Sequence, residues 1–197
     1  MPSIDDETKL HRILIGAQHQ FDQYGYRKTT LEDIARAIGV SRTSLYLYFR
    51  NKDAIFRAVS QNIHAQALDE ATKQLSTDDT IKHRVRMALL ARHEPFFTAQ
   101  TSSPHGKELH DEYSRLCGDI VIASHTAFET DLAKALKRSA RLGEIDLKTS
   151  GVSSNDAARI LNLSTASQKR GATQVIEFRH RVSQLVTICF SGLALRG

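Results

Sequence analysis

Residues 29–52, with the sequence TTLEDIARAIGVSRTSLYLYFRNK, carry the clearest pattern of apolar and polar positions in the chain. Thr30 precedes the first apolar position, and the acid Asp33 follows three residues later, which is a capping arrangement for a helix start. Gly39 then tolerates the left-handed backbone of a sharp helix end. The pattern therefore predicts a short capped helix followed by a tight turn. Its apolar positions recur at helical spacing: Leu31, Ile34, Ala35 and Ile38.

A second short helix is expected from about Arg42 to Phe49. The Ser41 hydroxyl can cap its first turn, and Leu45 points inward together with Phe49. None of the remaining positions carries a carboxylate. A short helix with an apolar back and an acid-free polar front suits a groove lined with phosphates. The positions on that front are Arg42, Thr43, Ser44, Tyr46 and Tyr48.

The rest of the chain predicts further helices, because three prolines leave few helix breaks and no segment alternates with period two. The fold class is therefore all-α. Pro95 is expected to kink or end the helix that starts after residue 76. We expect a helix-turn-helix domain at 1–50, a linking helix at 51–75 and a C-terminal domain at 76–197. The other helices are expected at about 5–24, 52–75, 108–116, 118–142, 154–169 and 173–195.

Composition adds little to this picture. The 197 residues carry a net charge of +5, which favours an anionic partner only mildly. Two scattered cysteines, Cys117 and Cys189, fit a reduced cytoplasmic protein. The N-terminus is polar and acidic, unlike a signal peptide, and the apolar run 185–195 is too short to span a membrane. The last helix is apolar on nearly every side, so the rest of the chain or a second copy must cover it.

An enzyme is the competing class of protein. Nine histidines are present, but none forms a helical pair with metal-ligand spacing, and no CxxC, GxSxG or phosphate-binding glycine motif occurs. We therefore expect no catalytic residue, metal or cofactor. His93 lies close in sequence to Phe96 and Phe97 and could line a pocket. A helical interaction protein without DNA binding is the third alternative, against which the acid-free front counts.

The stretch and its flanks resemble the DNA-binding region of the TetR family of bacterial transcriptional regulators, over about residues 12–59. The resemblance implies homodimers with a three-helix DNA-binding head and a C-terminal domain for ligand binding and dimerisation. Such proteins usually repress transcription and release DNA when a small molecule binds. The residues that carry the resemblance are Phe21, Gly25, Tyr26, Thr29, Thr30, Ile34, Ala35, Gly39, Val40, Ser41, Leu45, Tyr46, Tyr48, Phe49 and Lys52.

Carried onto this chain, the resemblance implies that Ser41, Arg42, Thr43 and Ser44 face base edges or nearby phosphates. It also implies backbone contacts from Thr30, Tyr46, Tyr48 and Lys52. A bidentate contact from Arg42 to guanine and a phosphate contact without sequence information both remain open. Lys52 at a helix start is either part of a phosphate site or a solvated lysine.

The resemblance further implies a near-palindromic double-stranded operator, with each subunit of a homodimer reading one half-site. We expect the dimer face at about 154–195. The effector pocket should lie among the helices between about 81 and 128. Its candidate residues are His93, Phe96, Phe97 and Phe128. The effector, the operator and the choice between repressor and activator stay open.

Overall fold

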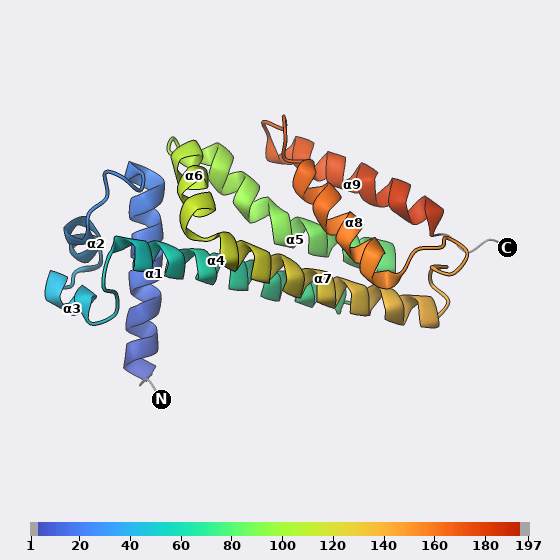
Figure 1. The fold of residues 1–197 in the computed structure, drawn as a ribbon, viewed down its shortest axis with the longest axis horizontal. Coiled ribbons are helices and arrows are strands. Elements are labelled where there is room, and N and C mark those ends of the chain that lie inside the picture. Colours follow the sequence, from blue (N-terminus) through green and yellow to red (C-terminus); the bar gives the residue numbers. More distant parts are fainter. Residues whose placement is uncertain (1–3, 194–197) are drawn as a thin grey trace. The chain divides into compact units, whose positions relative to one another are not determined.

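The computed structural model describes residues 4–193, and its side chains from residue 7. Over this range the chain forms nine α-helices and no strand (Figure 1). None of these helices is long and apolar enough to cross a membrane. The helices are α1 (Ile4–Tyr24), α2 (Leu31–Ile38), α3 (Arg42–Tyr46), α4 (Lys52–Leu75), α5 (Ile81–Ser102), α6 (Gly106–Leu116), α7 (Gly118–Arg141), α8 (Ser154–Ser167) and α9 (Val175–Gly192).

The chain divides into two compact units. The first unit contains residues 1–64 and 99–121, and the second contains 65–98 and 122–197. The helices α4, α5 and α7 each contribute residues to both units. This division follows packing, whereas the predicted functional boundaries at residues 50 and 75 remain a prediction.

The first unit is built on an aromatic cluster. Phe21 of α1, Tyr26 of the following loop and Phe56 of α4 pack with ring centroids 5.0–5.8 Å apart. Tyr113 of α6 lies against Phe56 at 4.6 Å. Burying each such ring contributes roughly 1.5–3 kcal/mol, and edge-on contacts between rings add a smaller amount. The cluster therefore ties α6 to α1 and α4, although Tyr113 lies 57 residues after Phe56 in sequence.

The predicted capped helix and its turn are confirmed. The Thr30 hydroxyl accepts a hydrogen bond from the Asp33 backbone N–H, and the Asp33 carboxylate accepts from the Thr30 N–H. The hydrogen bonds that the Thr30 hydroxyl and N–H donate to the Asp33 carboxylate lower the pKa of Asp33 below its ordinary value. Gly39 has a φ of 71°, and its N–H bonds back to the last turn of α2. Gly16 permits α1 to lie close to α2, because a Cβ there would meet Ile38 at 2.1 Å.

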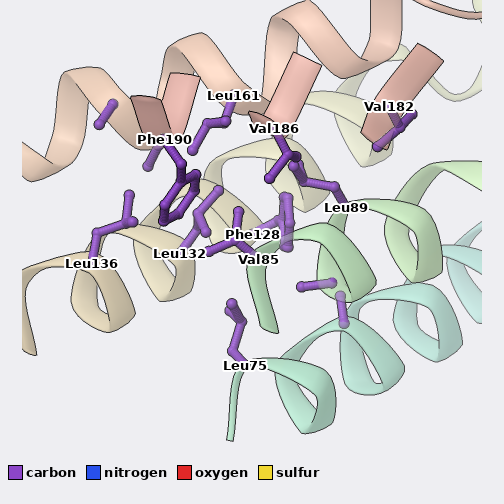
Figure 2. Close-up of a cluster of buried hydrophobic side chains, with 14 of the residues drawn as sticks. Leu75, Val85, Leu89, Phe128, Leu132, Leu136, Leu161, Val182, Val186 and Phe190 are labelled. Carbon is purple, nitrogen blue, oxygen red and sulfur yellow. The ribbon is translucent and has the colours of Figure 1, made fainter. Parts of the chain in front are cut away.

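The second unit has one continuous apolar core that draws on α4, α5, α7, α8 and α9. Figure 2 shows the side chains from these helices pointing toward one another. Phe128 of α7 and Phe178 of α9 are fully buried in this core. The labelled core residues are Leu75, Val85, Leu89, Phe128, Leu132, Leu136, Leu161, Val182, Val186 and Phe190.

Three helix boundaries differ from the sequence-based expectations. α5 continues through Pro95 to Ser102, because His93 and Phe97 are buried on either side of the exposed proline and hold the helix together. α3 ends at Tyr46 rather than Phe49, and residues 47–49 form the turn that leads into α4. α9 ends at Gly192, while residues 194 and 195 of the predicted last helix lie outside the described part of the chain.

Candidate functional site

The helix α3 presents one face to the first unit and the other to solvent. Ser41 caps it, with its hydroxyl accepting from the Ser44 N–H at 3.0 Å. Leu45 is 1% exposed and anchors the helix in the core. The outward side chains are Arg42, Thr43 and Tyr46. As the sequence predicted, the helix has an apolar back and an exposed front without a carboxylate.

Arg42 and Tyr46, one turn apart, form a pair on this front. The Arg42 guanidinium donates a hydrogen bond to the Tyr46 hydroxyl at 3.0 Å and lies 5.5 Å from the centre of its ring. This hydrogen bond raises the pKa of Arg42 above its ordinary value. The two side chains had been predicted as separate contacts, and the structure brings them together. Tyr46 therefore orients the guanidinium.

The other side chains predicted to contact DNA differ in their exposure and in their partners within the protein. The hydroxyls of Ser41 and Ser44 lie 2.9 Å apart and share a hydrogen bond, so both are partly occupied. Thr43 is exposed, and Tyr48 is half-buried with the Lys9 ammonium 5.5 Å from its ring centre. Leu47 was not among the predicted contacts, and its side chain is 80% exposed beside α3. Its position between two tyrosines was the available signal.

Lys52 lies at the start of α4 and points back to the loop between α1 and α2. Its ammonium donates to the carbonyls of Tyr26 at 2.7 Å and Thr29 at 2.9 Å, with that of Arg27 at 3.4 Å. It also lies 4.3 Å from the centre of the Tyr26 ring. Burial lowers the pKa of Lys52 from its usual range. All three ammonium protons therefore have acceptors within the protein.

Thr30, the other predicted phosphate contact at a helix start, is also engaged internally. Its hydroxyl donates to the Asp33 carboxylate at 2.6 Å in addition to accepting from the Asp33 N–H. The side chain remains exposed at the surface. Its capping bonds are local, so they leave one side of the hydroxyl open to solvent.

The helix α6 contacts the same loop, and the residues just before α6 contact the end of α1; sequence reasoning missed both contacts. The Glu108 carboxylate accepts from the Arg27 backbone N–H at 2.7 Å, and the Ser103 hydroxyl donates to the Asp22 carbonyl at 2.8 Å. Gly25 allows this approach, since it has a φ of 80° and a Cβ there would lie 2.6 Å from Glu108. The partners are 81 residues apart, so no local pattern could reveal them.

Comparison with known proteins finds a family model that matches the N-terminal helices of this chain. Residues 13–59, which span α1 to the first turns of α4, match the family model described as bacterial regulatory proteins, tetR family. The N-terminal part of the chain is therefore similar to this family. The capped helix, the Gly39 turn and α3 all lie inside the matched region. The resemblance inferred from the sequence is confirmed.

Individual relatives also match the chain over a short region. It is 38% identical over 64 residues to an HTH-type transcriptional repressor of Mycobacterium tuberculosis, Rv1474c, covering 31% of this chain and 34% of the relative. It is 44% identical over 56 residues to the HTH-type transcriptional regulator RutR of Escherichia coli, covering 28% and 26%. The chain thus matches about a third or less of these curated relatives' length, and they are transcriptional regulators rather than enzymes.

A solved structure matches the chain along nearly its full length. A transcriptional regulator from Cytophaga hutchinsonii superposes with a TM-score of 0.80, covering 95% of this chain and 99% of the other, at 18% identity. At this identity the likeness concerns the fold alone. It confirms the all-α architecture, with an N-terminal helix-turn-helix followed by further helices.

The predicted effector residues fall into two groups in the second unit. Phe97 and Phe128 are packed into the core, where Phe97 stacks on Phe178 at 5.1 Å. Phe96 is half-buried, and His93 is buried with its Nε2 2.8 Å from the Asn162 side-chain oxygen. A shallow surface hollow of about 450 Å³ lies elsewhere, on α9, and includes none of these four side chains. The pocket assignment stays a prediction.

Asn162 of α8 joins three helices through its amide. Its oxygen accepts from His93 of α5, and its NH₂ donates to His125 Nδ1 at 2.9 Å and to Glu129 at 2.8 Å, both on α7. The reverse amide orientation would place two oxygens against each other at Glu129, so this orientation is the satisfied one. It makes His125 neutral, because Nδ1 of that ring must accept, while His93 donates from Nε2. Burial lowers their pKa values from 6.5, as do the nearby cations Lys169 and Arg92.

Replacing Lys52 tests whether its ammonium holds the loop. Lys52→Met should lower the free energy of unfolding by about 1–3 kcal/mol, because it leaves buried carbonyls without their charged donor. Lys28→Met, which removes an exposed ammonium from the same loop, should change it by less than about 0.5 kcal/mol. Urea unfolding followed by circular dichroism measures both. Unchanged stability together with a weaker salt dependence of DNA binding would instead place the ammonium on a phosphate.

The stability of the protein should fall as the pH drops from 7.5 to 5. The native state keeps His93 neutral below pH 6.5, while the unfolded chain takes up its proton. The free energy of unfolding therefore falls by up to about 1.4 kcal/mol for each pH unit because of this group. His125 contributes less, because solvent reaches it. Thermal unfolding of His93→Gln should show a shallower pH dependence than wild type. His110→Gln, at an exposed position on α6, is the control and should keep the wild-type slope.

Proposed function

We propose that this chain is a TetR-family DNA-binding regulator of transcription, a repressor that a small-molecule effector releases from its operator. One observation carries the proposal most directly: the exposed, acid-free face of the capped helix α3, with the guanidinium of Arg42 oriented by Tyr46. A helix of this kind enters a major groove with its first residues toward base edges. The name of the Mycobacterium tuberculosis relative, a transcriptional repressor, supports the direction of regulation.

The exposed side chains of the candidate surface divide into base and backbone contacts. Arg42 is placed to read guanine through its two terminal nitrogens, while Thr43 and the exposed Leu47 can meet thymine methyl groups. Tyr46 and Tyr48 remain candidates for the phosphate backbone, with Thr30 at the start of α2. Lys52 acts on DNA binding indirectly in this proposal, because its ammonium holds the loop that positions α2.

The helix α6 offers a route by which an effector can act on the first unit. Residues 99–121 belong to the first unit, while α5 and α7, which flank them in the chain, continue into the second unit. An effector that favours a different position of α6 would move Glu108 away from the Arg27 N–H and release the loop before α2. Induction then requires the effector to bind the DNA-incompetent state more tightly.

A homodimer through α8 and α9 completes the proposal, within about residues 154–195. Both helices carry large apolar side chains that this single chain leaves exposed: Ile160, Leu163, Ile176 and Ile188. Exposed apolar side chains grouped on neighbouring helices favour burial against a partner. A two-fold dimer would present two copies of α3 to half-sites about one helical turn, roughly 34–36 Å, apart.

Arg42→Ala tests the base contact. With DNA from upstream of the protein's own gene and single-base variants of the protected site, wild type should lose about 1–3 kcal/mol at the base pair that Arg42 reads. Arg42→Ala should lose that preference, as measured by fluorescence anisotropy. Arg138→Ala, at the far end of α7, is the charge-matched control. Uniformly weaker binding with a salt slope lower by about one would assign Arg42 to a phosphate instead.

Charged substitutions on α8 and α9 test the dimer. Sedimentation velocity at micromolar concentration should give a dimer for wild type and a monomer for Leu163→Glu and Ile188→Glu, because each would place a carboxylate in an apolar interface. Ile15→Glu changes a half-exposed apolar residue of α1 and should remain dimeric. A monomeric wild type would rule out the dimer.

A further inference from the structure

Arg92 is the most deeply buried cation described in the second unit. Its side chain is 1% exposed, and its Nε has no hydrogen-bond partner. One terminal nitrogen donates to the Ser124 hydroxyl at 3.1 Å, and among residues 7–193 no carboxylate lies within ion-pair distance. Burial alone lowers the pKa of Arg92 to about 10. A buried guanidinium without a counter-charge is unfavourable.

Arg84 is a second buried arginine on the same helix, and its guanidinium has a carboxylate partner within the protein. It lies two turns earlier on α5 and is 9% exposed. Its terminal nitrogens donate to the Glu144 carboxylate at 3.0 Å, the Ser139 hydroxyl at 3.2 Å and the Leu75 carbonyl at 3.3 Å. Its Nε is also unpartnered. The difference between the two arginines is therefore the missing carboxylate at Arg92.

A second cation, Lys169, lies beside the Phe96 ring together with Arg92. The Arg92 guanidinium carbon lies 5.3 Å from the centre of the Phe96 ring, and the Lys169 ammonium lies 5.4 Å from it. Lys169 has no ion pair among the described residues, and burial followed by repulsion from Arg92 lowers its pKa to about 8. Two like charges beside one ring repel each other in a medium that screens them poorly.

The acids in this part of the second unit are already engaged. Glu129 accepts from the Asn162 amide at 2.8 Å, and Glu94 forms a two-point ion pair with Arg179 at 2.5 and 2.8 Å. The neighbouring His93 and His125 are neutral and add no negative charge. Among residues 7–193 there is therefore no counter-ion within ion-pair distance of Arg92 or Lys169.

We propose that Arg92 and Lys169, which both lie beside the Phe96 ring, bind a small organic anion whose carboxylate or phosphate supplies the missing counter-charge. The planar guanidinium can hold two oxygens of such a group at once, and the ammonium can hold a third contact. The Ser124 hydroxyl, which already fixes the guanidinium, orients it for this role. The inference rests on the proposed function in one respect, namely that this anion is the effector.

Binding to the full-length chain without DNA tests the site. The probes are acetate, benzoate, hexanoate and inorganic phosphate, with benzamide as the uncharged match to benzoate, measured by isothermal titration calorimetry. At least one anion should bind while benzamide does not, and the arms separate a carboxylate from a phosphate ligand. Arg92→Met and Lys169→Met should each weaken that binding at least about tenfold. Arg159→Met, an exposed arginine of α8, should leave it unchanged.

Thermal unfolding without ligand separates a binding role from a structural one. Arg92→Met should keep or raise the melting temperature, because it removes an uncompensated buried charge, whereas Arg84→Met should lower it by breaking a buried ion pair. A lower melting temperature for Arg92→Met, no binding of any anion, or anion binding that survives both substitutions overturns the proposal. If anions bind through Arg92 while the chain binds no DNA, the proposed function fails and the anion site stands.

Discussion

Three backbone carbonyls of the loop between α1 and α2 converge on a single ammonium group, that of Lys52. The loop decides where α2 begins, and α2 with the Gly39 turn decides where α3 points. α6 holds the loop from another direction through Glu108. The placement of the candidate DNA-reading helix therefore depends on two contacts from helices that come much later in the chain.

This arrangement explains how the five-residue helix α3, the candidate recognition element, keeps its shape. A helix as short as α3 has little stability of its own in water. Its shape is maintained by the Ser41 cap, by the buried Leu45 and by the capped helix in front of it. On the exposed front, Arg42 and Tyr46 restrain each other, as do the hydroxyls of Ser41 and Ser44.

The second unit contrasts two ways of burying charge. At Arg84 the chain supplies Glu144, so the guanidinium is compensated within the fold. At Arg92 and Lys169 the described part of the chain supplies an aromatic ring and a hydroxyl but no acid within ion-pair distance. Net charge cannot distinguish these cases, since both arginines count equally in the sequence. Only the positions of the carboxylates separate a structural cation from a candidate anion-binding one.

The sequence by itself determined what local spacing controls. The Thr30–Asp33 cap, the Gly39 turn, the Ser41 cap and the start of α4 after Asn51 all depend on partners within four residues, so their patterns predict them. The family resemblance, the all-α fold and the acid-free front follow from the same short range. Of the two outcomes expected at Pro95, a kink or a helix end, the end is wrong, because tertiary packing carries α5 on to Ser102.

Tertiary structure alone decided which of these side chains are free to act. Lys52 finds its acceptors 23 to 26 residues away, Glu108 finds Arg27 across 81, and Asn162 reaches His93 across 69. Phe97 and Phe128 were predicted as pocket residues from their chemistry, but core packing occupies them. A polar or aromatic side chain has the same letter whether it is satisfied internally or open to a ligand. Its partners exist only once distant segments have packed together.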